Sequence, residues 1–473
     1  MKPFLVRPVI AGFLLLVLMA GGRGTDSSAL TLFQAIHLAI SDNPDLQSAR
    51  LLDKAQKTRS TQALGTYLPT LAVGESFIST NNPLTSFGIL LNEALVTSTS
   101  FTNLNTLNNP ANTQTFGFQA ALSETIFSGG GRYHGLKAAN RESEAQHELV
   151  RWKEKNLVNQ TARAYLDVLL SSDRVSVLSE MVRSAREEEK IARDNVSAGK
   201  SVRAELLAAS VHVRHLSVRL LQAQKDVTLA RIRLSRLLGR RSDAGLLSRD
   251  PALLSRSVTA YHLLQTQGVD SLVGQALSDR PDYRALKKKI DARDEMAKGA
   301  LAGFFPQVSA QGLYNEYNPT LAWGKQDYTV IGQVQWNLFN GLSDREKRQR
   351  SELALLAERY REEDRKNALI YDVRAAYAES ETLSGALSVD RERLKEEAEE
   401  RRIVHERYEV GLVRFADMLR SDVAYRRARL RLLTDRTRFV EAVLALKLAI
   451  GALSENDAVF GSEAAAEPSP KKE

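Results

Sequence analysis

The residues able to do metal or acid–base chemistry are scattered along this chain of 473 residues. Of its seven histidines, only His212 and His215 have the i,i+3 spacing that puts two rings on one face of a helix. A zinc site needs a third protein ligand, and the sequence around this pair offers none. There are no cysteines, which excludes thiolate sites, cysteine nucleophiles and disulfides. No phosphate-binding glycine loop or nucleophile motif occurs. We therefore expect no enzyme activity, no cofactor and no metal.

Two acidic residues occupy equivalent positions. Glu205 and Asp417 each lie six residues after a glycine, Gly199 or Gly411. If each glycine ends a helix, the acid falls in the first turn of the next helix, where the helix dipole stabilises a carboxylate. The simple interpretation of the two acids is therefore as helix-start residues.

These positions belong to a duplication of the whole chain. Pro44 recurs as Pro281 and Pro69 as Pro306, an offset of 237 residues. Further along the offset is 212, as between the glycines at 199 and 411, and the difference of 237 − 212 = 25 marks an insertion in the first copy. Because each copy is too long for a solenoid unit, the duplication predicts a protein with two-fold pseudo-symmetry.

Long proline-free tracts predict long helices. None of the twelve prolines lies in 111–250 or 320–467. Since proline breaks a helix interior, we predict helical hairpins over 131–238 and 341–450, each reversed at its glycine. Apolar residues at alternating steps of three and four predict coiled-coil packing in the first return arm, and Asp435 interrupts the equivalent seam in the second. Shorter helices are predicted over 30–65 and 271–303.

Alternating apolar and polar residues predict four strands. They cover 70–79, 115–127, 307–317 and 328–339, long enough for tilted strands that cross a membrane. A soluble hairpin packed on its own helices is the alternative. Four strands cannot close a barrel, so the membrane interpretation requires several chains. Aromatic residues at the strand ends would form the interfacial bands: Tyr67, Phe304, Phe305, Tyr317, Trp323 and Tyr328.

The chain divides into five segments. A basic start, a short apolar run and small residues predict a secretory signal peptide over 1–25, with a buried N-terminal helix as the alternative. The first repeat covers 26–240, a linker 241–270, and the second repeat 271–453. Residues 454–473 are rich in Ala, Glu, Pro and Lys and predict a disordered tail. The net charge of +8 is spread along the chain, which argues against nucleic-acid binding.

The chain resembles the TolC family of outer-membrane efflux proteins over about Leu30 to Leu453. The resemblance rests on Asn43-Pro44, on Leu338-Phe339-Asn340-Gly341 and, most specifically, on Arg407-Tyr408-Glu409-Val410-Gly411-Leu412. It implies a mainly α-helical protein with a transmembrane β-barrel part. Three chains would form a twelve-stranded barrel and a periplasmic α-helical coiled-coil tunnel, with the linker in its equatorial region.

The resemblance also implies a function. The protein would be the passive outer-membrane exit duct of a tripartite efflux or type I secretion system, embedded in outer-membrane lipid. Its partners would be a periplasmic adaptor and an inner-membrane transporter of the RND, ABC or MFS type. Without a lipid-acceptor cysteine it would be unlipidated. Adaptor contact is implied for Val410, Gly411, Leu412, Gly199 and Lys200, and a periplasmic gate for Tyr408, Arg414, Asp417 and Glu205.

The sequence departs from the family pattern at both tips. Asn195 and Val196 replace a basic and an aromatic residue in the first copy, and Val413 and Arg420 depart from the gate of the best-known member. Drugs, metals and polypeptides all stay open as cargo. The alternative function is an exported coiled-coil structural or adaptor protein of the periplasm.

Overall fold

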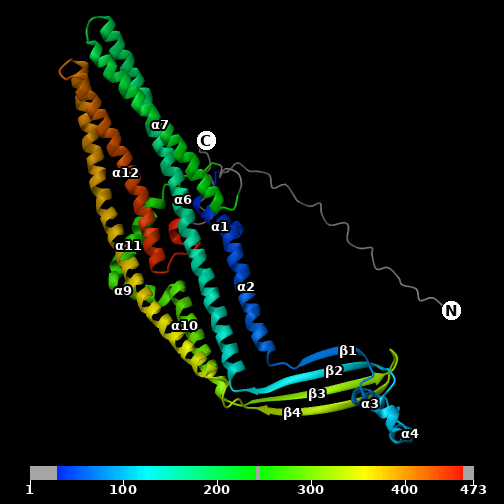
Figure 1. The fold of residues 1–473 in the computed structure, drawn as a ribbon. Helices are drawn as coiled ribbons and strands as arrows, with labels where there is room; N and C mark the ends of the chain where they lie inside the picture. The colour runs from blue at the N-terminus through cyan, green and yellow to red at the C-terminus, as the bar shows by residue number, and fades with distance from the viewer. Residues whose placement is uncertain (1–28, 241–245, 462–473) are drawn as a thin grey trace, which may run out of the picture.

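The computed structural model describes residues 29–240 and 246–461. The molecule is long and narrow, with two helical hairpins at one end and a four-stranded sheet at the other (Figure 1). The predicted signal peptide, 1–25, lies outside the described residues, as do 241–245 and 462–473.

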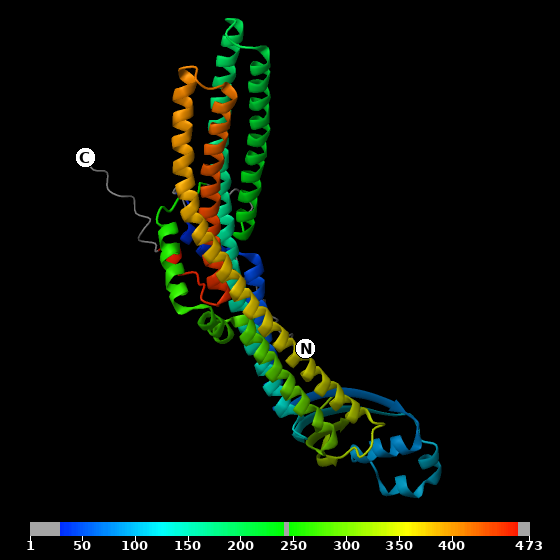
Figure 2. The same cartoon turned by 90° about the vertical axis from the view of Figure 1, so that its left-hand side faces the viewer.

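The two hairpins have identical lengths. In the first copy α6 (Gly131–Ser197) has 67 residues and α7 (Arg203–Leu237) has 35. In the second copy α11 (Ser343–Glu409) and α12 (Phe415–Ala449) have the same 67 and 35. A helix of this greater length spans about 100 Å. The two hairpins run side by side to neighbouring tips (Figure 2).

The coiled-coil seams are buried. Leu216, Ala223 and Leu234 of α7 are buried in the first hairpin, and Leu432 and Phe439 of α12 in the second. The polar member of the second seam, Asp435, is buried as well, beside Asp390 of α11. Arg431 Nε lies 3.3 Å from one Asp390 oxygen and 3.5 Å from one Asp435 oxygen. The seam therefore continues through this position because an arginine accompanies the buried acids.

The shorter helices are broken, so the single helices predicted over 30–65 and 271–303 are wrong. The first is divided into α1 (Leu32–Asp42) and α2 (Pro44–Gly65). The second is divided into α9 (Val269–Asp279), α10 (Pro281–Gly299) and a 3-10 turn, η1 (Ala300–Phe304). The reason is the proline, which disfavours helical backbone in the residue before it.

Each break stacks one helix on another. The α2 helix starts where α7 ends, and Asn43 Nδ2 donates a hydrogen bond of 2.9 Å to Leu237 O. In the second copy α10 starts where α12 ends, and Arg280 Nη1 donates one of 3.4 Å to Ala449 O. We call these places junction one, around Asn43, and junction two, around Arg280. They make nearly continuous helical columns out of separate helices.

The sheet is antiparallel, in the order β1-β2-β3-β4. Its strands are β1 (Thr70–Thr80), β2 (Thr113–Ser128), β3 (Gln307–Asn318) and β4 (Lys325–Gln335). The fourth strand ends before the predicted 339 because Gln335 pairs with Gln307, and Pro306 before it has no N–H to donate.

The insertion in the first copy forms a helical cap beyond the sheet. It contains α3 (Pro83–Asn92), α4 (Ser98–Thr102) and α5 (Leu104–Asn108), between β1 and β2. In the second copy β3 and β4 are joined directly by the short segment 319–324. The enlarged loop of the first copy therefore lies at the end of the sheet farthest from the hairpins (Figure 1).

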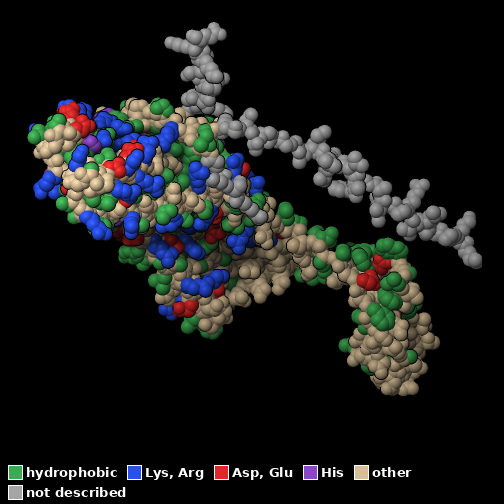
Figure 3. Space-filling view, turned by 90° about the horizontal axis from the view of Figure 1, so that it is seen from above, with side chains coloured by type: hydrophobic (Ala, Val, Ile, Leu, Met, Phe, Trp, Pro, Cys, Tyr) green, Lys and Arg blue, Asp and Glu red, His purple; other side chains and the backbone are tan. Residues whose placement is uncertain are grey.

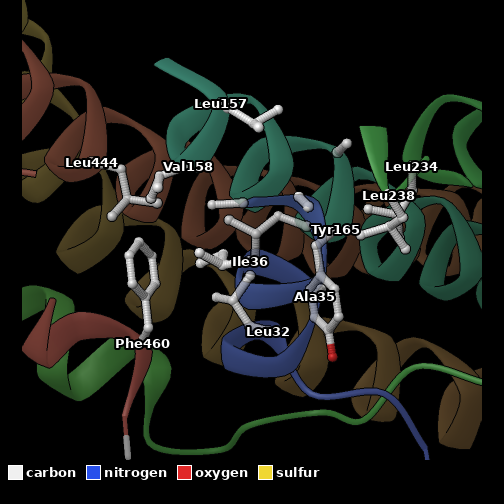
Figure 4. Packing of buried hydrophobic residues seen from close by; sticks show 14 of the residues in the cluster. Leu32, Ala35, Ile36, Leu157, Val158, Tyr165, Leu234, Leu238, Leu444 and Phe460 are labelled. Carbon is white, nitrogen blue, oxygen red and sulfur yellow. The ribbon is translucent and has the colours of Figure 1, made fainter. Parts of the chain in front are cut away.

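The largest core lies at mid-length, where α1 packs against α6 (Figure 4). Leu32 and Ile36 of α1 and Leu157 and Tyr165 of α6 are all buried in this core. Tyr165 Oη donates a hydrogen bond of 2.7 Å to Leu30 O, which holds the start of the described chain against α6.

Part of the predicted tail is ordered, which corrects the disorder predicted for 454–473. The 3-10 turn η2 (Ala458–Phe460) packs Val459 and Phe460 into the core. Arg256 Nε, on α8 (Leu253–Gln267), donates to Val459 O at 3.0 Å. The composition of 454–461 is mostly polar, but Val459 and Phe460 have a core to bury in.

Candidate functional site at the hairpin tips

The two tip turns have the same backbone. Gly199 and Gly411 have φ of 70° and 75°, in the left-handed region that glycine enters without strain. The N–H of Lys200 donates to Asn195 O at 2.8 Å, and the N–H of Leu412 donates to Arg407 O at 2.8 Å. These six-to-one bonds close a helix end in the manner of a Schellman motif. Glycine at these positions is thus explained by the turn itself.

Apolar side chains are exposed at the tips. Val410 and Leu412 are 69% and 73% exposed, and Val202 is exposed on the other hairpin. A Cβ built on Gly199 or Gly411 would meet no atom within 4 Å. No described part of the chain covers this surface, so it is available to a partner.

Tyr408 packs inside the end of the bundle. It contacts a small apolar cluster in which Ala192 comes from α6, Ala209 from α7, and Phe415 from α12. The rings of Tyr408 and Phe415 have centroids 6.0 Å apart. Burial, followed by the charge of Glu205, raises the pKa of Tyr408 above its ordinary value. Tyr408 therefore joins the two hairpins just behind the turns.

The other three predicted gate residues do not contact one another as one group: Asp417 pairs with Arg414, and Glu205 lies apart on the other hairpin. Asp417 lies 3.5 Å from Arg414 Nε and 3.2 Å from Arg420 Nη1, within the first turns of α12. Glu205 accepts a hydrogen bond from Ser201, next to its own turn. Both acids fall in the first turn of their helices, as predicted. Among the described residues, no ion pair joins Glu205 to either arginine.

A polar layer that the sequence did not reveal crosses the bundle behind Tyr408. Its centre is Asp422 of α12, which is buried. Arg401 Nε donates to it at 2.5 Å, His405 Nε2 lies 3.3 Å away, and Arg426 pairs with it as well. Burial alone would raise the pKa of Asp422, but Arg401 and Arg426 outweigh it and hold that pKa below its ordinary value.

The first hairpin contributes two further titratable groups to this polar layer. Burial, followed by the charge of Asp422, raises the pKa of Glu188 on α6 to about 7. Burial, followed by His215, lowers the pKa of His212 on α7. The i,i+4 spacing of Asp422 and Arg426 could have indicated an ion pair. It could not have indicated that α6 and α7 face them.

The aromatic residues lie at the two ends of the sheet. Tyr67, Phe304 and Phe305 are at the end that meets the helices, and Trp336 Nε1 donates to Phe304 O at 3.1 Å. The other end carries Tyr317, Trp323 and Tyr328, and the last two are largely exposed. Figure 3 shows Lys and Arg gathered over the helical end, whereas the visible face of the strand end carries few charged side chains.

The histidine pair forms no metal site with other described residues. Within 29–240 and 246–461, no three His, Cys, Asp or Glu side chains are placed to hold an ion. In the same residues, no helix combines the length and the apolar character needed to cross a bilayer.

The fold matches solved outer-membrane channels. CusC has a TM-score of 0.74 at 18% identity, with 95% of this chain and 99% of CusC covered. The CmeC channel of Campylobacter jejuni has a TM-score of 0.74 at 14% identity, covering 90% and 87%. The open MtrE channel of Neisseria gonorrhoeae has a TM-score of 0.73 at 17% identity, covering 90% and 91%. At these identities the likeness shows the fold, and it confirms the predicted fold class.

Comparison of the sequence with families settles the membership. Among curated proteins no sequence match is found. The model of the outer membrane efflux protein family matches residues 35–240 and 272–452, which include both hairpins and all four strands. This match favours a duct over the structural or adaptor alternative. The chain belongs to the outer membrane efflux protein family.

Proposed function

We propose that this protein is the outer-membrane exit duct of a tripartite efflux or type I secretion system, working as a homotrimer. The observation that carries the proposal is the family match over both repeats, each with a strand pair and a long helical hairpin. The duct is passive, and an inner-membrane transporter of the RND, ABC or MFS type supplies the energy.

The open sheet supports assembly into a trimer. Strands β1 and β4 form its edges, and among the described residues each has one side without a partner strand. Leu71 and Val73 of β1 are exposed, as are Tyr328 and Val330 of β4. Unpaired backbone groups cannot lie in lipid, so β4 of one chain would pair with β1 of the next. Three chains then close twelve strands, with the aromatic residues near both membrane interfaces.

The tips support contact with a periplasmic adaptor. Val410 and Leu412 present apolar surface beside Gly411, and Gly199 and Lys200 form the equivalent turn. Exposed apolar side chains that lie together are typical of a surface that another protein covers. Behind them Tyr408, Arg414, Asp417 and Glu205 form the proposed periplasmic gate. The absence of cysteine from the sequence supports an unlipidated protein. The basic start and short apolar run near the N-terminus support export by a signal peptide.

Fractionation and conductance test the duct. We expect trimers that resist detergent in the outer-membrane fraction, and conductance when they are added to planar bilayers. A monomer recovered from the soluble periplasm would contradict the proposal.

Pull-down tests the adaptor contact. The full-length trimer should retain the adaptor, and Gly411→Val should reduce the retained amount because valine cannot hold φ of 75° without strain. Gly385→Val, in the middle of α11 with no neighbour near its Cβ, is the matched control. Equal retention by both variants would show that the tip is not the contact.

A further inference from the structure

A groove beside junction one has no role in the function proposed above. It has a volume of about 720 Å³, which lies in the range of small-molecule sites. The start of α2, the middle of α6 and the end of α7 line it. From its shape and charge we infer that this groove binds small organic anions on their way through the duct.

The duplication explains why the groove is open. At junction two the equivalent space is filled by Arg280, which is 3% exposed and pairs with Asp282 and Asp372. At junction one the shorter Asn43 stands in place of this arginine, at the offset of 237. At the offset of 212, neutral Gln160 stands in place of Asp372. The first copy therefore lacks both the filling side chain and one of its acidic partners.

Basic residues line the emptied space. Four of them, Lys153, Arg163, Arg233 and Arg236, face two acids, Asp45 and Asp167, which leaves 4 − 2 = 2 positive charges.

One of the four basic residues is already paired. Lys153 Nζ lies 2.7 Å from Asp45. Burial raises the pKa of Asp167, and the charges of Arg233, Arg174 and Arg163 oppose this rise. Within the described residues, Arg163, Arg233 and Arg236 form no ion pair. Their guanidinium groups are available to a carboxylate, sulfate or phosphate, which arginine binds in a bidentate way.

Five of the eight remaining lining residues are apolar, and the other three, Asn43, Asn156 and Gln160, carry neutral amides. Leu157 is buried beneath the groove, and Pro44, Leu46, Ala164 and Leu237 complete its wall. A site of apolar walls with a few convergent charges suits a ligand with an apolar body and an anionic group. Inorganic anions would fill only a small part of the volume. The favoured ligand is thus an amphiphilic organic anion.

The groove lies on the inner face of the proposed tunnel. Tyr165 of α6 points to the side covered by α1, where its hydroxyl bonds to Leu30 O. Arg163 lies two residues before it, about 200° around the helix, and Gln160 and Asp167 share that uncovered side. A tunnel must stay open, so the covered face is outside and the bare face is inside. This step rests on the proposed function, and a trimer would carry three such grooves.

Binding of a charged dye tests the groove. Fluorescein, an anionic xanthene, and rhodamine 6G, a cationic xanthene of similar size, are titrated with the full-length protein in detergent, and anisotropy is read. We expect fluorescein to bind, and Arg163→Gln or Arg233→Gln to weaken it about fivefold each, because a charge-assisted hydrogen bond is lost. Both arginines are exposed, so neither change should disturb folding.

Arg374→Gln is the matched control. It removes the same charge from α11, where Arg374 is 61% exposed and pairs with exposed Asp270 of α9. Its fluorescein affinity should equal that of the unchanged protein. The anion site would be overturned if all three variants bound fluorescein with equal affinity. It would also be overturned if the unchanged protein bound rhodamine 6G as tightly as fluorescein.

Conductance separates this inference from the proposed function. Under a KCl gradient across a planar bilayer, the Arg163→Gln/Arg233→Gln double variant should shift the reversal potential toward cation selectivity, and Arg374→Gln should not. Absence of any conductance in the unchanged protein contradicts the duct, and the anisotropy result still decides the groove. Normal conductance with unchanged selectivity overturns the luminal position.

Discussion

Junction one and junction two have the same backbone but different chemistry. In both, the residue before proline has a ψ of 118°, which separates two helices, and a left-handed glycine, Gly239 or Gly451, ends the stacked helix. At junction one Asn43 accepts hydrogen bonds from the N–H groups of Asp45 and Leu46, both at 3.0 Å, as a helix N-cap does.

Arg280 cannot accept hydrogen bonds, so junction two is held in another way. Its guanidinium makes bonds of 2.9 and 3.0 Å to the two oxygens of Asp282, lies 3.1 Å from Asp372, and stacks over Trp152 at 4.6 Å. Arg365 of α11 also pairs with Asp282. One copy thus uses a local cap and the other a buried ion network. The Asn43 cap leaves space for the groove at junction one, whereas the Arg280 network fills the equivalent space at junction two.

The largest effect is expected from removal of the buried arginine. Arg280→Met should lower the free energy of unfolding by about 3 kcal/mol, because nearly buried Asp282 would keep only Arg365 as an ionic partner. Chemical denaturation of the detergent-solubilised protein, followed by circular dichroism at 222 nm, measures this. The matched control is Arg374→Met, whose ion pair is exposed and should contribute less than about 1 kcal/mol. Equal losses would show that junction two does not depend on its network.

The next effect concerns the two glycines. Gly239→Ala should cost about 2 kcal/mol, because its φ of 68° is strained for alanine and the new Cβ would lie 2.4 Å from Asp42 O. Gly451→Ala has the same strain at φ 75°, but its nearest neighbour is Arg280 Cα at 3.1 Å. The same denaturation assay should therefore rank Gly239→Ala as more damaging. The reverse order would mean that junction two is the tighter one.

These junctions show how far the sequence could be interpreted. The duplication, the strand alternation and the glycine turns depend on neighbouring residues or on constant offsets, and the two-repeat organisation followed from them, whereas the full fold class was implied by the family resemblance. The ion network could not be predicted, because Arg280 meets Asp372 and Ala449 from parts of the chain 92 and 169 residues away. The break at Asn43 was missed although Pro44 signals it, because the apolar pattern continues on both sides.

The candidate site divides in the same way. The tip glycines and the helix-start acids Glu205 and Asp417 follow from local helix rules, and the structure has them in the predicted turns. The polar layer around Asp422 and Glu188 does not, because it depends on which faces of four helices meet. Local capping is readable from sequence, and the packing of one hairpin on the other is not.

A smaller effect is expected at junction one. Asn43→Ala removes the cap of α2 and the bond to Leu237 O, and should cost about 1 kcal/mol by the same assay. Asn43→Asp keeps the oxygen that accepts from the α2 N–H groups and loses only the Nδ2 donor, so it should recover most of the loss. If Asn43→Asp were as unstable as Asn43→Ala, the cap would not be what stabilises junction one.

The smallest effect is a difference in acid sensitivity. Burial would raise the pKa of Asp282, but the hydrogen bonds and charges of Arg280 and Arg365 outweigh it and hold that pKa below its ordinary value. A depressed folded-state pKa stabilises the protein above the unfolded pKa of about 4, and this contribution is lost as the pH falls through the folded value. Junction one has an uncharged cap, so acid should weaken junction two selectively. We therefore expect denaturation midpoints to fall between pH 6 and pH 3 by less in Asp282→Asn than in the unchanged protein. The control is Asp270→Asn, because the Asp270 carboxylate is 87% exposed. In this variant the denaturation midpoint should fall between pH 6 and pH 3 by as much as in the unchanged protein. If the midpoint of Asp282→Asn fell as much as that of the unchanged protein, the acid sensitivity would arise elsewhere. The charge of Asp282 would then not distinguish the two junctions.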